Sequence, residues 1–434
     1  MRYYSTKNKN HLASLQEAVL RGLPPDNGLY MPEHIPAFSS GEVQAMASWA
    51  LTDIAFHAAK KFLAGDVPEE VIGSIVRKAI HFDAPLVSLT DNLHILELFH
   101  GPTLAFKDFG ARFMAHLMGW LVRGDDRKLT ILVATSGDTG GAVASGFLGV
   151  EGIEVIILYP SGKVSPLQEK QLTSLGQNIT ALEIEGTFDD CQALVKQAFL
   201  DPGLSEKLRL SSANSINISR LIPQTFYYLY AATRPQLAGS PIVFSVPSGN
   251  FGNLCAGLIA RRMGAPIEHF IASTNVNAVV PEYLGSGQFQ PRPSIATISN
   301  AMDVGNPSNF WRMAELYDQD PEHMRKDITG LAFSDEATRT AMKEVYDRFG
   351  YTIDPHGAVG YLGWKTYEAR HPGKRQGIVV ETAHPAKFTE VVEDVLAIKV
   401  PLPSQLQAVA AGEKQSRLFP VNFPQFRTFL MDRV

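Results

Sequence analysis

Residues 97–110 read ELFHGPTLAFKDFG, and this stretch decides our interpretation because it sets one lysine, Lys107, among apolar residues. From Leu104 to Leu121, apolar side chains recur at steps of three and four residues, which predicts an amphipathic helix with Thr103 as its N-cap. A lysine amine has a pKa of about 10.4 in water, so it becomes a nucleophile at neutral pH only if desolvation or another cation lowers that value by roughly 3 units. An apolar pocket favours such a carbonyl-binding lysine.

The simpler interpretation is that Lys107 lies on a solvated helix face. Lysine is rarely fully buried, and its ammonium group would then pair with Asp108 or another acid.

The composition is that of an ordinary globular protein. The 434 residues are 45% hydrophobic and 19% charged, and a chain of this length can form two or three domains with substantial cores.

The net charge is -5 and no basic run reaches five residues, so we expect no nucleic acid partner. Cys191 and Cys255 lack metal-ligand and CxxC spacing, which predicts buried thiols in a reducing compartment and no metal site. Neither a signal-peptide core nor an apolar run of membrane-spanning length occurs, so we expect a cytoplasmic protein.

Strand, loop and helix patterns alternate along the middle of the chain. The runs LTILVA, IEVIILYP, ITALEI, IVFSVP and HFIAST are typical of buried strands, with loops and helix-like segments between them. This alternation predicts an α/β fold with parallel sheets, in which ligands bind at the carboxyl ends of strands. Residues 11–80 look largely helical, and short strands are expected at residues 85–89 and 94–98.

One helix start is well marked. Ser165 is followed by Pro166 and, three residues on, by Gln168, which predicts a capping box with proline at the first helical position. The stretch GSGQFQPRPS, residues 285–294, is expected to be irregular, and a proline-bearing tail begins at about Pro401.

The loop SGNFGN, residues 248–253, follows a strand and opens a helix. Gly249 and Gly252 let the backbone curl so that N–H groups point inward, and the helix N-terminus adds partial positive charge, which suits a phosphate. The loop lacks the GxxxxGK[ST] and GxGxxG patterns, which favours a phosphate monoester over a nucleotide triphosphate or a dinucleotide. A glycine turn of this kind can also be purely structural.

The loop TSGDTG, residues 135–140, occupies the same position in another strand, loop and helix unit. Its hydroxyls and amides could take a carboxylate or phosphate, whereas Asp138 would resist an anion unless it caps the helix. In NSINISR, residues 214–220, Arg220 is suited to bidentate capture of phosphate, although an arginine near a helix start is more often a surface residue.

The stretch ETAHPAKF, residues 381–388, places a hydroxyl at the end of the strand GIVV. Thr382 could hydrogen-bond a heterocyclic nitrogen there. His384, and His356 in DPHGAVGY, could titrate usefully or be structural.

Taken together, these stretches closely resemble threonine synthase of the bacterial and fungal type. HGPTLAFKDFG, ATSGDTG, NSINISR, VPSGNFGN, NAMDVGNPSN, DPHGAVGY and ETAHPAKF occur in that order, and DNGLYMPEHIP is similar to the family's opening segment. The resemblance implies the tryptophan-synthase-β-like α/β fold, with two parallel-rich open sheets flanked by helices. It also implies a pyridoxal-5'-phosphate enzyme that converts O-phospho-L-homoserine and water to L-threonine and phosphate, the last step of threonine biosynthesis.

The resemblance assigns roles to individual residues. Lys107 matches the Schiff-base lysine, and Thr382 matches the hydroxyl that faces the pyridine nitrogen. The cofactor-phosphate loop comprises Ser248, Gly249, Asn250, Phe251, Gly252 and Asn253. The substrate carboxylate loop comprises Thr135, Ser136, Gly137, Asp138 and Thr139, and the substrate phosphate group comprises Asn214, Ser215 and Arg220, with Thr139 near it. The chain departs from the expected pattern at Asn253, where close relatives suggest Asp, and at Asp138, where many proteins of the wider fold carry Asn.

We expect three consecutive regions: a mainly helical region at 1–100, a smaller α/β domain with the lysine helix and substrate loops at 101–235, and a larger α/β domain with the cofactor-phosphate loop and a C-terminal extension at 236–434. A monomer or homodimer acting on a small molecule is expected. Two alternatives stay open: a phospho-lyase on the same fold that releases a keto acid, and a non-catalytic protein that binds a nucleotide or metabolite.

Overall fold

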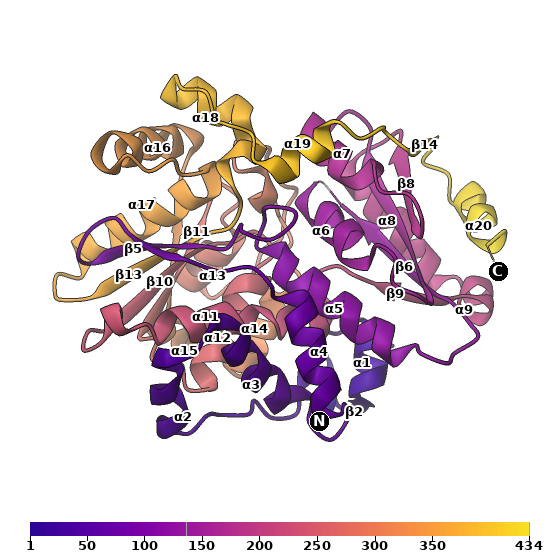
Figure 1. Cartoon of the computed structure of the whole chain (residues 1–434), viewed down its shortest axis with the longest axis horizontal. Coiled ribbons are helices and arrows are strands. Elements are labelled where there is room, and N and C mark those ends of the chain that lie inside the picture. Colours follow the sequence, from indigo (N-terminus) through magenta and orange to yellow (C-terminus); the bar gives the residue numbers. More distant parts are fainter. Residues whose placement is uncertain (136, 434) are drawn as a thin grey trace. The chain divides into compact units, whose positions relative to one another are not determined.

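The chain divides into two compact units in the computed structural model, which describes residues 1–135 and 137–433 (Figure 1). Unit 1 comprises residue 1 and residues 31–106 and 221–402, and unit 2 comprises residues 2–30, 107–220 and 403–434. This interleaved division differs from the three consecutive regions that the sequence suggested, because strands distant in sequence share a sheet. No helix of the described residues is long and apolar enough to cross a membrane.

Unit 2 is built on a five-stranded parallel sheet with the strand order β14-β8-β7-β6-β9. The predicted strands are confirmed at β6 (Leu129–Ala134), β7 (Ile153–Pro160) and β8 (Ile179–Ile184), whereas β9 (Arg209–Ser212) and β14 (Ser416–Phe419) were not predicted. The unit's helices are α1 (Leu15–Arg21), α5 (Lys107–Leu121), α6 (Asp138–Phe147), α7 (Pro166–Thr173), α8 (Phe188–Leu200), α9 (Pro202–Lys207), α19 (Ser404–Ala410) and α20 (Phe423–Met431). The short helix α10 (Ile218–Leu221) ends at the boundary between the units.

Unit 1 contains a six-stranded sheet with the order β12-β11-β10-β13-β5-β4, parallel except for the edge strand β4. Its strands are β4 (Leu86–Ser88), β5 (Leu93–Glu97), β10 (Ile242–Pro247), β11 (His269–Thr274), β12 (Ile328–Ala332) and β13 (Gln376–Glu381). Two parallel-rich sheets flanked by helices confirm the predicted α/β fold class.

Unit 1 also contains eleven α-helices among the described residues, and the first three lie in the region that the sequence predicted to be largely helical. The α-helices are α2 (Ser40–Ala45), α3 (Leu51–Leu63), α4 (Glu69–Ala79), α11 (Gln224–Ala232), α12 (Gly252–Arg262), α13 (Val279–Ser286), α14 (Phe310–Leu316), α15 (Pro321–Asp327), α16 (Asp335–Phe349), α17 (Pro355–Arg370) and α18 (Thr389–Leu396). Short 3-10 helices are η1 (Met46–Ser48), η2 (Pro235–Leu237), η3 (Asn300–Met302) and η4 (Pro385–Phe388). The expected irregular stretch has no helix or strand from Gly287 to Ser299.

The first residues of the chain form strands that the sequence did not suggest. β1 (Arg2–Ser5) and β2 (Asn8–Ser14) pair as an antiparallel hairpin, and β3 (Tyr30–Pro32) follows α1. The helical prediction was therefore wrong at residues 11–14. The alternation of polar and apolar residues in HLAS is too short to distinguish a strand from a helix start.

Each unit has its own apolar core. In unit 1, side chains of β5, β10, β11 and β13 pack with those of α16, α17 and α18, and in unit 2 side chains of β6, β7 and β8 pack with those of α8 and α20. Both cysteines are buried free thiols, as predicted, and burial raises the pKa of Cys191 and of Cys255 to about 12. Neither thiol is therefore reactive at neutral pH.

Candidate active site

Lys107 is the first residue of α5, so the helix begins three positions later than a cap at Thr103 implies. The segment before it is held in an extended form within unit 1. Ala105 forms an isolated bridge with Ala383, and the N–H of Phe106 donates to the carbonyl of Thr382 at 2.9 Å. The carbonyl of Thr103 accepts the ammonium group of buried Lys387 at 2.9 Å. The prediction that Thr103 is the N-cap was therefore wrong, because these tertiary bonds delay the start of the helix.

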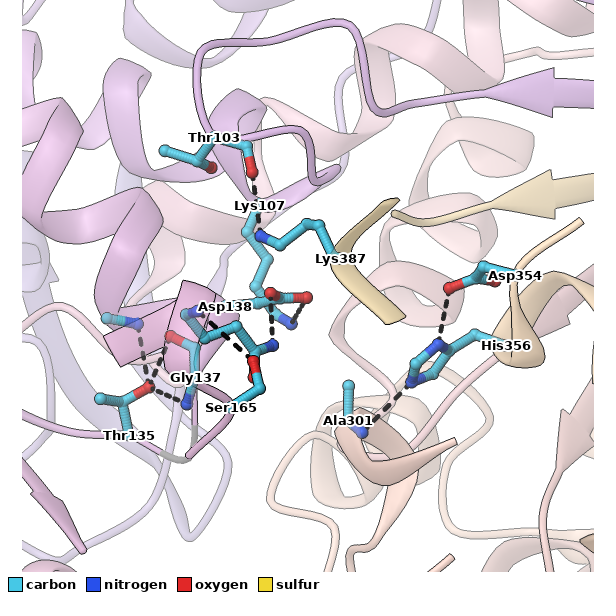
Figure 2. Close-up of polar contacts among 12 residues, drawn as sticks. Thr103, Lys107, Thr135, Gly137, Asp138, Ser165, Ala301, Asp354, His356 and Lys387 are labelled. Carbon is cyan, nitrogen blue, oxygen red and sulfur yellow. Dashed lines mark hydrogen bonds and ion pairs between the residues drawn. The ribbon is translucent and has the colours of Figure 1, made fainter. Parts of the chain in front are cut away.

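The amine of Lys107 faces a carboxylate within unit 2 (Figure 2). Lys107 Nζ lies 3.8 Å from Asp138 Oδ2, and the side chain of Lys107 is 17% exposed while that of Asp138 is buried. A carboxylate at this distance favours the charged form of an amine. An apolar pocket or a second cation, which the sequence suggested, would instead favour the neutral amine. The structure therefore places Lys107 in a site that is mostly shielded from solvent and contains a negative charge.

Asp138 does not cap α6, although the sequence left that role open. The helix begins at Asp138, and Gly137 is its N-cap residue. The hydroxyl of Thr135 takes the capping role, because it accepts the N–H of Gly137 at 3.0 Å and that of Gly140 at 2.9 Å. Gly137 has a φ of 146°, which only glycine adopts without strain.

The carboxylate of Asp138 is held from α7. Gln168 Nε2 donates to Asp138 Oδ1 at 2.9 Å, and the hydroxyl of Ser165 donates to Gln168 Oε1 at 3.1 Å. The predicted cap is confirmed, since the N–H of Gln168 donates to Ser165 Oγ at 3.4 Å and Pro166 occupies the first helical position. The Gln168 side chain, which would complete a capping box, is directed to Asp138 instead.

Thr139 offers two donors in the same loop. It is partly exposed, and neither its N–H nor its hydroxyl is hydrogen-bonded to another residue that the structure describes. Ser136, predicted to belong to this loop, lies outside the described residues. The residue best placed to bind an anion in this loop is therefore Thr139, because the hydroxyl of Thr135 is engaged within the loop.

The NSINISR segment is largely buried in unit 2. The guanidinium group of Arg220 is buried, donates to the carbonyl of Ala213 at 2.5 Å and lies against Gly110. Burial lowers the pKa of Arg220 to about 10, while the negative charge of Asp108 acts in the opposite direction. An arginine so deeply placed differs from the surface residue that is usual near a helix start.

Asn214 and Ser215 are half-buried in the turn before Arg220. Asn214 Nδ2 donates to the carbonyl of Ala134 at 3.4 Å, and its buried Oδ1 has no hydrogen-bond partner among the described residues. The sequence did not single out Asn217, whose side chain fixes the turn by donating to the carbonyls of Val19 and Ser212 at 2.8 and 3.2 Å.

In unit 1, the loop from Ser248 to Asn253 joins β10 to α12 as predicted. The N–H groups of Gly249, Phe251, Gly252 and Asn253 make no hydrogen bond to another residue of the described chain. The left-handed residue of the loop is Phe251, with a φ of 59°, and not a glycine. Four such donors at a helix N-terminus suit a phosphate group.

Glycine is required at position 249 because the backbone of Ala301 and Met302 lies too close to leave room for a side chain. A Cβ atom there would lie 2.7 Å from the Cα of Met302 and 3.0 Å from the carbonyl oxygen of Ala301. The loop's polar side chains mostly serve its own shape. Asn253 Oδ1 accepts the Ser248 hydroxyl at 2.9 Å and its Nδ2 donates to a backbone carbonyl at 2.9 Å, while Asn250 Oδ1 accepts the N–H of Ser308 at 2.5 Å.

Thr382 is buried and directly follows β13. Its hydroxyl makes no hydrogen bond to the part of the chain that the structure describes, so it can accept or donate one to a ligand. The preceding residue, Glu381, is completely buried, and the sequence analysis missed it. A carboxyl group at the end of an apolar strand run is the signal that could have found it.

The two ambiguous histidines have structural contacts in unit 1. His356 Nδ1 lies 2.7 Å from Asp354 Oδ2, and its Nε2 accepts the N–H of Ala301 at 3.2 Å (Figure 2). His384 Nδ1 accepts the N–H of Ala386 at 3.0 Å. Burial, followed by the nearby His100, lowers the pKa of His384 below its usual value of 6.5. These contacts favour the structural interpretation of both residues.

Comparison with known proteins identifies the family of this chain. Residues 83–382 match the family model of pyridoxal-phosphate dependent enzymes. The chain is thus a pyridoxal-phosphate-dependent enzyme with an α/β fold. Residues 2–80 match the model of the threonine synthase N terminus, and residues 357–429 match that of the threonine synthase C-terminal region. The chain belongs to the threonine synthase family.

The similarity to individual members extends over the whole chain. Threonine synthase of Serratia marcescens is 44% identical over 99% of this chain and 99% of its own length. The crystal structure of threonine synthase from Escherichia coli is 44% identical, with a TM-score of 0.93 over 100% of both chains. The PLP-bound threonine synthase from Brucella melitensis is 34% identical, with a TM-score of 0.92 over 100% of this chain and 99% of that one.

Proposed function

We propose that this protein converts O-phospho-L-homoserine and water to L-threonine and phosphate, with Lys107 as the Schiff-base lysine. The observation that carries the proposal is the Ser248–Asn253 loop, whose four N–H groups without partners among the described residues suit the phosphate of pyridoxal phosphate. Bound pyridoxal phosphate supplies an aldehyde for covalent attachment and a conjugated ring that accepts electron density from the substrate. Membership of the threonine synthase family supports the choice of substrate.

The chain's own residues then have distinct tasks. Lys107 Nζ would hold the cofactor covalently, and its free amine would take the proton from the substrate α-carbon. Thr382 hydrogen-bonds the pyridine nitrogen, which its buried and unengaged hydroxyl favours. The cofactor-phosphate loop acts mainly through backbone N–H groups, with Ser248 and Asn253 fixing its shape.

We assign the substrate's two anionic groups to unit 2. The loop of Thr135, Ser136, Gly137, Asp138 and Thr139 takes the substrate carboxylate, with Thr139 supplying the donors. The substrate phosphate is held by Asn214, Ser215 and Arg220, where the buried guanidinium of Arg220 contributes positive charge. Asp138 has no role in binding an anion, because its own charge opposes it; its partner is the amine of Lys107.

The test is product identification. Purified protein loaded with pyridoxal phosphate is incubated with O-phospho-L-homoserine, and we expect threonine and inorganic phosphate in equal amounts. Formation of 2-oxobutanoate in place of threonine would indicate the phospho-lyase. Lys107→Ala protein should form no threonine and, unlike the wild type, no borohydride-stabilised adduct with the cofactor.

We further propose that the protein works in the cytoplasm as a monomer or homodimer. The absence of a membrane-spanning helix among the described residues is compatible with this location. Light scattering coupled to gel filtration measures the mass of the assembly, and a tetramer would contradict the proposal.

A further inference from the structure

The side chain of Gln168, which lies on α7 and is 3% exposed, contacts three other residues of unit 2. Its Nε2 donates to Asp138, its Oε1 accepts the hydroxyl of Ser165, and its amide lies where a Cβ atom of residue 137 would point. None of these contacts belongs to the assignments made above for substrate or cofactor.

The orientation of the Gln168 amide follows from its two neighbours. An ionised carboxylate only accepts hydrogen bonds, so the NH2 group must face Asp138. The hydroxyl of Ser165 accepts the backbone N–H of Gln168 and therefore directs its own proton to Gln168 Oε1. A flipped amide would place two acceptors against each other at Asp138, and the observed orientation is the one that satisfies both ends.

Gly137 provides the room for this amide. A Cβ atom at Gly137 would lie 2.8 Å from the Cδ, the Nε2 and the Oε1 of Gln168. Position 137 is thus restricted to glycine both by its φ of 146° and by the contact with Gln168. The loop that contains Gly137 therefore packs directly against the Gln168 side chain of α7.

We propose that Gln168 is a positioning residue for Lys107, holding one oxygen of Asp138 so that the other faces the lysine nitrogen. A buried carboxylate without a donor would rotate, or take up a proton, because burial penalises its charge. The amide N–H of Gln168 stabilises the ionised form and fixes its orientation. Asp138 then stabilises positive charge on the nitrogen of Lys107. The inference rests on the proposed function, since it treats Lys107 as the residue that binds the cofactor.

The other charged side chains on the helices packed against α6 have partners of their own. On α7, Glu169 lies 2.7 Å from Lys414 Nζ, and Lys170 donates to the carbonyl of Gly412 at 2.5 Å. Near α5, burial lowers the pKa of Arg112 and of Arg220, and the negative charge of Asp108 on α5 acts on both in the opposite direction. Among these charged side chains, Asp138 is therefore the one whose ionisation and orientation we expect Gln168 to affect.

The experiment follows the protonation of the Schiff-base nitrogen rather than activity. Wild-type protein and the variants Gln168→Met, Asp138→Asn and Thr173→Val are loaded with pyridoxal phosphate, and visible absorbance is titrated against pH. Methionine matches the length of glutamine without its N–H. Thr173→Val is the matched control, since Thr173 is buried on the same helix and donates only to the carbonyl of Glu169, at 2.9 Å.

We expect the titration midpoint of Gln168→Met to move to lower pH by about one unit, because an opposite charge shifts such an equilibrium by roughly 1 to 3 units when it is held close. Asp138→Asn should shift at least as far in the same direction, and Thr173→Val should match the wild type. A midpoint for Gln168→Met equal to that of Thr173→Val would overturn the proposal. If Gln168→Met does not fold, Ser165→Ala replaces it, and an unshifted midpoint in that variant has the same meaning.

Failure of the proposed function gives a different result. Wild-type protein would then show no visible band and no borohydride-stabilised adduct at Lys107, whatever residue occupies position 168. A loaded wild type with a normal band and unshifted Gln168→Met would contradict the positioning role alone.

Discussion

Replacing Glu381 by glutamine tests whether the folded protein keeps the carboxyl group of Glu381 protonated. The Glu381 side chain is completely buried, its Oε1 accepts the N–H of Asp354 at 2.8 Å, and its Oε2 has no hydrogen-bond partner among the described residues. Burial raises the pKa of Glu381 well above its ordinary value of 4.5, and the negative charges of Asp354 and Glu97 act in the same direction. The folded protein therefore keeps this carboxyl group neutral well above that pH.

The sign of the pH dependence follows from this shift. The folded state binds the proton of Glu381 more tightly than the unfolded state, so the free energy of unfolding falls as pH rises from the unfolded pKa towards the higher folded pKa. Each pH unit in that interval costs up to about 1.4 kcal/mol. Glutamine does not ionise and retains an oxygen for the N–H of Asp354. We expect Glu381→Gln to match the wild type near about pH 4 and to exceed its stability near about pH 8 by roughly 1.4 kcal/mol or more.

The assay is urea unfolding followed by tryptophan fluorescence at both pH values. Glu42→Gln is the control with the opposite sign. In the capping box of α2, the N–H of Ser39 is the main cause that lowers the pKa of Glu42 to about 2, so this group stabilises the fold above its unfolded pKa and loses that effect as pH falls towards 2. Glu42→Gln should be less stable than the wild type at both pH values, and by a smaller margin at about pH 4 than at about pH 8. Equal destabilisation of Glu381→Gln at both pH values would refute the reasoning.

Three further substitutions test the loops. Gly249→Ala should weaken pyridoxal phosphate binding at least tenfold in a fluorescence titration, because its Cβ would displace Met302; unchanged affinity would show that the loop tolerates this displacement. Thr135→Val should destabilise unit 2 by about 2 kcal/mol in urea unfolding, since it leaves the N–H groups of Gly137 and Gly140 without an acceptor. Thr139→Val should raise KM for O-phospho-L-homoserine about tenfold without changing the cofactor's absorbance; an altered spectrum would place Thr139 at the cofactor instead.

Within the two large sheets, the interior strands could be predicted from the sequence, whereas β4 was the only edge strand that was predicted. β6, β7, β8, β10 and β11 are buried over most or all of their length, so each reads as an apolar run between turn signals. The strands that were missed within the two large sheets, β9, β12 and β14, all lie at a sheet edge. An edge strand has one hydrogen-bonded neighbour and a partly exposed face, so RLSS and SRLF carry too few apolar residues to stand out.

The candidate site was likewise only partly predictable from the sequence. Lys107 and the Ser248–Asn253 loop could be proposed from the sequence because residue type and local pattern suffice to mark a lysine in an apolar helix start or glycines after a strand. The counter-charge Asp138 and its partner Gln168 are 30 residues apart in sequence, and their contact depends on how α6 and α7 pack. The same holds for the bond between Lys387 and Thr103, which moves the helix start.

Unit 2 is completed by the last part of the chain. β14 forms the edge of its sheet beside β8, and Phe419, Phe426 and Leu430 contribute to its core. During synthesis on the ribosome, the edge of β8 and the apolar surface beneath residues 416–430 stay uncovered until those residues have been made. An uncovered strand edge beside apolar surface can pair with strands of other molecules, so we expect a chain shortened before β14 to aggregate.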